Sequence, residues 1–143
     1  MNHVSYHGTN ADSAQKIAGP PPNIGIELGR GELGKGFYTG NSPAIASSWA
    51  HTKYPETAYI IEIEIEMEEF VKLKPHLIKT DAEVRTIWED LKLRKLTRSF
   101  VFNCDYVIAP FATIREHGGQ FKFESKRSEE LLNKSKIKCM SCV

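Results

Sequence analysis

A histidine and two aromatic residues stand where they could bind a flat, hydroxyl-bearing ligand. His7 ends a short run of alternating apolar residues, and Gly8 follows it, so the backbone there could approach a ligand closely. Tyr38 comes directly after a glycine-rich loop, and Trp49 lies one helix further on. Two aromatic side chains on either side of a cleft can hold a planar ring by stacking. None of these residues is specific alone, because a lone histidine is usually structural.

The apolar pattern predicts the elements that would position these residues. Asn10 or Asp12 can cap a short helix that Gly19 closes, and Ser42-Pro43 begins a second helix. A capping box at Thr80–Glu83 begins a third. We expect strands over residues 3–8, 37–39, 59–67, 100–102, 106–109 and 120–124, and a last short helix at 128–132. Because strands outnumber helices and do not alternate regularly with them, the fold class is expected to be α+β.

A long loop between the first helix and Tyr38 is a second functional indication. It begins at Pro20-Pro21-Pro22, which forbids helix, and continues with five glycines: Gly25, Gly29, Gly31, Gly34 and Gly36. A loop of this length in a compact domain is unusual and tends to be functional.

Two motifs in sequence order resemble the ADP-ribosyltransferase superfamily, in its diphtheria-toxin and poly(ADP-ribose)-polymerase branch. Tyr6-His7-Gly8-Thr9 is similar to the first motif of that branch, and Gly34-Lys35-Gly36-Phe37-Tyr38 with the following helix is similar to the second. The resemblance covers residues 5–51 and returns around 105–132. It implies a split antiparallel β-sheet with short flanking helices and an NAD-binding cleft, in a domain over residues 1–133 followed by a basic tail over 134–143.

The resemblance also implies NAD+ as the co-substrate and a role for each matching residue. His7 would hydrogen-bond a ribose hydroxyl, and the Gly8 backbone, beside Thr9, would bind the nicotinamide carboxamide. Tyr38 would stack on the nicotinamide ring, with Trp49 closing the other side. Arg30 and Lys35 either reach the pyrophosphate or simply solvate the loop.

The third motif departs from the family pattern. The family places a catalytic glutamate at the start of a late strand, and Gln120 stands there in this chain. An amide can orient a ribose, but it can neither carry negative charge nor remove a proton. Glu124 lies ~13 Å further along an extended strand, too far to make the same contact, and is expected to be solvated. With His7, Tyr38 and Gln120 as catalytic residues, transfer of a single ADP-ribose is therefore favoured over chain elongation.

The acceptor is open between protein and nucleic acid. Lys122, Lys126 and Arg127, together with the lysines of 134–138, could form a basic surface for RNA or DNA, or a solvated lysine-rich end. The family resemblance suggests a bacterial or phage toxin, with an antitoxin protein as a possible partner. Two alternatives use the same cleft: an NAD+ glycohydrolase that passes ADP-ribose to water, and an NAD+ or ADP-ribose reader that has lost turnover.

Composition limits the other possibilities. The 19 Lys and Arg residues nearly balance the 18 Asp and Glu residues, so no strongly charged partner is indicated. We expect no membrane span and no secretory signal, hence a cytoplasmic protein. Cys104 is expected in the core. Cys139 and Cys142 form a CxxC without a second ligand pair, which favours a reduced tail over a metal site, so we expect no metal.

Overall fold

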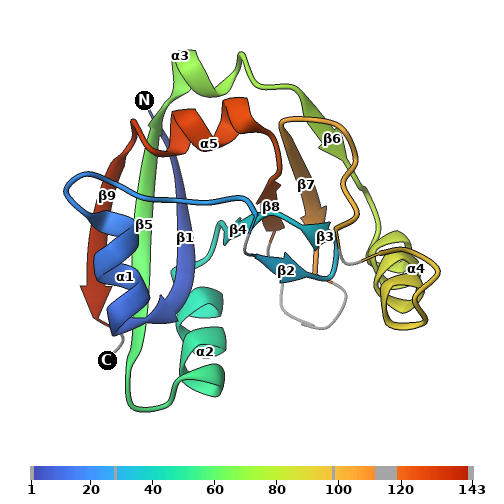
Figure 1. The fold of residues 1–143 in the computed structure, drawn as a ribbon, viewed down its shortest axis with the longest axis horizontal. Helices are drawn as coiled ribbons and strands as arrows, with labels where there is room; N and C mark the ends of the chain where they lie inside the picture. Colours follow the sequence, from blue (N-terminus) through green and yellow to red (C-terminus); the bar gives the residue numbers. More distant parts are fainter. Residues whose placement is uncertain (1, 28, 98, 112–118, 142–143) are drawn as a thin grey trace. The chain divides into compact units, whose positions relative to one another are not determined.

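The computed structural model describes residues 2–27, 29–97, 99–111 and 119–141, and its chain forms two compact units (Figure 1). The first unit comprises Met1–Ile24, Thr39–Lys72 and Glu130–Val143, and the second comprises Gly25–Tyr38 and Leu73–Glu129. Short helices accompany strands whose pairing is mixed but mostly antiparallel, so the predicted α+β class is confirmed.

The first unit is built on antiparallel strands in the order β4-β1-β5-β9, with β1 (Asn2–Asn10), β4 (Phe37–Gly40), β5 (Ala58–Glu66) and β9 (Lys136–Ser141). β1 pairs with β5 along its whole length, from Asn2 opposite Glu66 to Asn10 opposite Ala58. The expectation that the first strand ends at His7-Gly8 was therefore wrong. Because β5 offers partners as far as Asn10, the strand continues through the motif.

Two of the predicted helix caps lie in this unit and are confirmed. Asn10 accepts a 2.8 Å hydrogen bond from Ser13 N and begins α1 (Ala11–Ala18). Ser42 accepts a bond from Ile45 N and begins α2 (Pro43–Lys53). A third helix, α3 (Met67–Phe70), follows β5 directly.

The helices α1 and α2 pack on opposite faces of these strands. Cys139, which lies opposite Ile61, donates from Sγ to Ala14 O of α1. On the other face, a Cβ at Gly8 would lie 2.4 Å from Ala46 O of α2. Successive residues of a strand point to opposite faces, so the His7 side chain shares the face of Ile61, whereas Gly8 faces α2.

The segment expected to be a basic tail forms part of the sheet. Residues Lys136–Ser141 are β9, paired antiparallel with β5. Lys138 lies opposite Glu62, and Lys136 lies opposite Glu64. These two glutamates of β5 thus have lysines as cross-strand neighbours, which is favourable for opposite charges.

The second unit contains strands in the order β6-β7-β8-β4, in which β6 (Pro75–Leu77) and β7 (Tyr106–Pro110) are parallel, and β7 and β8 (Gly119–Phe123) are antiparallel. A separate hairpin, β2 (Arg30–Gly31) with β3 (Gly34–Lys35), forms inside the glycine-rich loop. α4 (Asp81–Lys92) begins at the predicted Thr80 cap, and α5 (Lys126–Leu132) follows β8.

The expected strand at 100–102 was wrong, because Phe100 and Phe102 lie in irregular chain. Their rings pack edge to face, and Phe102 also stacks on His76 of β6, with ring centroids 4.8 Å apart. Aromatic packing, and not strand pairing, therefore explains this apolar run.

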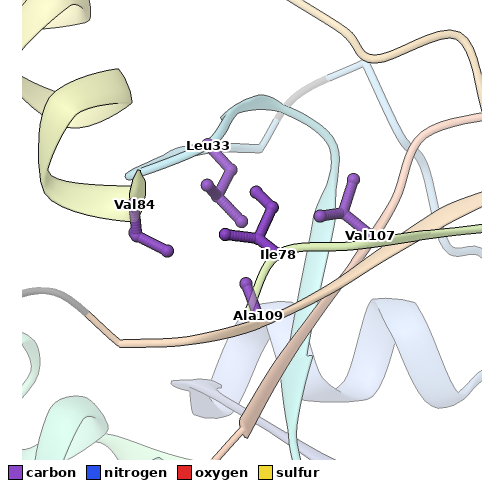
Figure 2. Packing of buried hydrophobic residues seen from close by; sticks show 5 residues of the cluster. All are labelled: Leu33, Ile78, Val84, Val107 and Ala109. Carbon is purple, nitrogen blue, oxygen red and sulfur yellow. The ribbon is translucent and has the colours of Figure 1, made fainter. Parts of the chain in front are cut away.

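A hydrophobic cluster joins the hairpin to the rest of the second unit. Leu33, at the hairpin turn, is fully buried against Ile78, Val84 of α4, and Val107 and Ala109 of β7 (Figure 2). Tyr38, Ile87, Phe102 and Cys104 pack around this cluster. The hairpin turn is thereby fixed in place by apolar burial.

Candidate functional site

Four of the expected site residues belong to the first unit: His7, Gly8, Thr9 and Trp49. The His7 side chain is half-buried on the same strand face as Ser5 and Thr9, both of which are buried. Since Tyr6 pairs with Gly40, the preceding Thr39 of β4 also points to this face. The hydroxyls of Ser5 and Thr39 are buried and have no hydrogen-bond partner within the described parts of the chain.

Gly8 has a structural reason to be glycine. Any Cβ there would collide with the Ala46 carbonyl of α2, so the residue permits close helix packing. Trp49 lies on the same helix and is 46% exposed, with the Lys53 ammonium 5.0 Å above its ring. The indole is therefore available for a contact with a ligand or a partner.

Three expected site residues, Arg30, Tyr38 and Gln120, belong to the second unit. The Tyr38 hydroxyl donates to Gly34 O at 2.5 Å and accepts from Leu33 N at 3.1 Å. A Cβ at Gly31 would lie 2.8 to 3.2 Å from three carbons at the hydroxyl end of the ring. This near-equal spacing places Gly31 over the ring face, so the hairpin covers that face. Burial, above all, raises the pKa of Tyr38 and keeps the phenol neutral.

Gln120 begins β8 in the second unit and is buried, with 3% of its surface exposed. Its side-chain amide donates to Pro110 O at 3.0 Å and to Glu32 Oε1 at 3.1 Å. Glu32 lies at the hairpin turn, 88 residues away in sequence. A carboxyl group thus lies in direct contact with the buried Gln120 amide.

The hairpin turn is also held by a buried ion pair. Lys122, fully buried, donates from Nζ to Leu33 O at 2.8 Å and lies 3.0 Å from Glu124 Oε1. The other oxygen of Glu124 accepts from Asn103 N. The expected solvation of Glu124 and the expected exposure of Lys122 were both wrong. Gln120, Lys122 and Glu124 alternate along the chain on one face, which the hairpin covers.

The other basic residues are largely engaged by acids or carbonyls. Lys126 pairs with Glu129 at 3.0 Å, and Arg127 approaches Asp105 to 3.8 Å. Arg30 donates to the carbonyls of Glu27 and Gly29, and Lys35 pairs with Glu27. Lys122 is buried and does not belong to a basic surface, whereas Lys126 and Arg127 are exposed.

The cysteines show no sign of chemistry in the described residues. Cys104 packs against the cluster at the hairpin turn, as expected for a core residue, and burial raises the pKa of its thiol to about 12. A thiol with so high a pKa is a poor nucleophile at neutral pH. Cys139 donates to Ala14 O within the first unit, and Cys142 lies outside the described residues.

Sequence reasoning missed Glu32, Lys122 and Glu124 as neighbours of the expected site. Glu32 stands between two glycine-rich stretches and carries no local signal of its contact with Gln120. The alternation of Gln120, Lys122 and Glu124 along one strand was visible, but polar residues on one face usually indicate solvent.

No protein-family model and no curated protein matches the chain. Among the described residues, no helix is long and apolar enough to cross a membrane.

Proposed function

We propose that the chain is an ADP-ribosyltransferase that cleaves NAD+ at the nicotinamide glycosidic bond and transfers ADP-ribose to a macromolecular acceptor. The observation that carries the proposal is the pairing of β1 with β4, since these strands bear the first and second motifs and Tyr6 lies opposite Gly40. The finer fold, a split ADP-ribosyltransferase-like sheet, and a toxin paired with an antitoxin protein are part of the same proposal.

The surroundings of His7 support a ligand rich in hydroxyl groups. Its side chain shares a strand face with the hydroxyls of Ser5 and Thr39, which lack partners in the described chain. Buried hydroxyls normally find a hydrogen bond, so these two leave bonding capacity on the strand face that also bears His7. The two riboses of NAD+ have that chemistry.

The surroundings of Tyr38 support a role in holding a flat ring. The phenol is neutral and its hydroxyl is anchored by two backbone groups, so the ring orientation is fixed before a ligand arrives. Gly31 covers one face of the ring and the hydrophobic cluster packs against Tyr38, so the ring is held in one place by its surroundings. Such fixed positioning lowers the entropic part of a reaction barrier.

In the reaction, the bond between ribose C1′ and the nicotinamide nitrogen breaks, and nicotinamide leaves with the bonding electron pair as a neutral molecule. An acceptor nucleophile then bonds to C1′ and gives up its proton. The resemblance assigns the ribose hydroxyls to His7 and the leaving ring to Tyr38 and Trp49. Gln120 would act through hydrogen bonding alone.

The test is to incubate the purified chain with NAD+ labelled in its adenylate half, with and without cell lysate. Label is separated into protein, RNA and DNA, and released nicotinamide is measured in parallel. Trp49→Ala is the better control variant, because Trp49 is exposed whereas Tyr38 also anchors the hairpin. Tyr38→Ala is included with a thermal-unfolding measurement.

Label on one macromolecular class that is lost in Trp49→Ala would support the transferase and identify the acceptor class. Nicotinamide release without macromolecular label would show that the chain is an NAD+ glycohydrolase and not a transferase. Binding of NAD+ without turnover would replace it with a reader, and absence of both binding and turnover would contradict the proposal.

A further inference from the structure

The geometry points to Glu32 as the catalytic carboxylate of this chain, supplied by the β2–β3 hairpin to the position where Gln120 replaces a glutamate. This inference rests on the proposed function. It assigns to a residue of the glycine-rich loop the negative charge that the third motif lacks.

The first support is the contact itself. Gln120 is buried, and its side-chain amide donates one hydrogen bond to Pro110 O of β7. This bond fixes the orientation of the amide. Its second amide hydrogen points to Glu32 Oε1 at 3.1 Å. This bond holds the Glu32 carboxyl group directly against the Gln120 amide.

The second support is that the turn bearing Glu32 is held from several sides. Leu33, the next residue, is fully buried, its carbonyl accepts from Lys122, and its N–H donates to the Tyr38 hydroxyl. Lys35 N donates to Phe100 O at 3.1 Å. A reactive group works best when neighbouring contacts fix it within a fraction of an ångström.

The third support is the position of Glu32 relative to Tyr38. The Tyr38 hydroxyl bonds to Leu33 N and Gly34 O, the two residues that follow Glu32, so the ring contacts the turn that bears the carboxyl group. Burial and, to a smaller extent, the charge of Glu32 raise the pKa of the phenol. The ring expected to hold nicotinamide and the charge needed beside the ribose therefore belong to the same small group of residues.

The role follows from the charge that develops during cleavage. As the bond from C1′ to nicotinamide breaks, positive charge grows on the ribose, and a nearby carboxylate lowers the energy of that state. When an acceptor hydroxyl or water forms its bond to C1′, it releases one proton. The Glu32 carboxylate takes that proton and passes it to solvent, a step that the Gln120 amide cannot perform.

The experiment compares Glu32→Gln with the unaltered chain in nicotinamide release from NAD+. Glu32→Gln keeps an oxygen that accepts the bond from Gln120 and removes only the charge. We expect kcat to fall by about 100-fold or more, while KM for NAD+ changes little, because general-base and charge effects act on the chemical step. Glu32→Asp, which keeps the charge, should retain more activity than Glu32→Gln.

The matched control is Glu89→Gln, the same change at an exposed position of α4 in the same unit. It should behave as the unaltered chain, and thermal unfolding checks that Glu32→Gln is folded. If the chain turns over NAD+ and Glu32→Gln keeps that turnover, the role of Glu32 is overturned and the proposed function stands. If the unaltered chain neither binds nor turns over NAD+, both are overturned.

Discussion

At the scale of single residues, the candidate site residues of the second unit also hold the backbone of the hairpin turn in place. The Tyr38 hydroxyl, the Gln120 amide and the Lys122 ammonium all contact the hairpin turn at residues 32–34. Substitutions there will change stability and activity together, so each activity test needs a folding measurement beside it. This is why exposed Trp49 separates ligand binding from folding better than Tyr38 does.

The buried pair of Lys122 and Glu124 gives a prediction of stability. In Lys122→Met, the Glu124 carboxylate stays buried without its cation, and the Leu33 carbonyl loses its donor. We expect the free energy of unfolding to fall by about 3–5 kcal/mol, measured by urea denaturation.

Two further variants test the cause. Lys126→Met removes an exposed lysine from its pair with Glu129 and should cost about 0–1 kcal/mol. Lys122→Met with Glu124→Gln should lose less than the sum of the two single changes. A loss in Lys122→Met no larger than that in Lys126→Met would contradict the buried pairing.

At the scale of elements, the β2–β3 hairpin is the part of the second unit that positions candidate groups. Its close approach to Tyr38 depends on Gly31, because the ring leaves no room for a Cβ. In Gly31→Ala, the hairpin and the Tyr38 ring must move apart, which disturbs the turn that bears Glu32. We expect kcat for nicotinamide release to fall, as it should in Glu32→Gln.

The control for this prediction is Gly25→Ala in the same loop. A Cβ at Gly25 meets nothing within 4 Å, so the change should leave turnover unaltered. Equal turnover in Gly31→Ala and the unaltered chain would show that hairpin placement does not limit the reaction.

At the scale of the whole molecule, the chain passes repeatedly from one unit to the other, so neither unit is a continuous segment. β9, near the end of the sequence, belongs to the first unit and pairs with β5 from Tyr59 opposite Ser141 to Glu64 opposite Lys136. Part of residues 134–143 therefore belongs to the sheet. Lys136 and Lys138 lie opposite Glu64 and Glu62 of β5.

Deletion of residues 134–143 should consequently destabilise the first unit. It would leave an unpaired edge on β5, whose Ile61 and Ile63 are fully buried in the intact chain. We expect a lower midpoint of thermal unfolding and a tendency to aggregate. Deletion of residues 142–143 alone keeps β9 and is the control, and equal melting of both truncated chains would show that the β9 pairing is dispensable.

The sequence by itself determined the features that depend on near neighbours. Helix caps depend on side-chain hydrogen bonds within a few residues, and the sequence predicted those at Asn10, Ser42 and Thr80. The strand β5 followed in the same way from its apolar pattern. The α+β class followed from the order of those elements.

Only the tertiary structure decided which polar groups are buried and which distant residues meet. Glu124, expected to be solvated, pairs with the buried Lys122. The lysine-rich end of the chain forms the strand β9. Glu32 contacts Gln120, which lies 88 residues away in sequence. Such contacts leave no local pattern, because the burial that stabilises them comes from elements far apart in sequence. The contact between Glu32 and Gln120 was for this reason visible only in the folded chain.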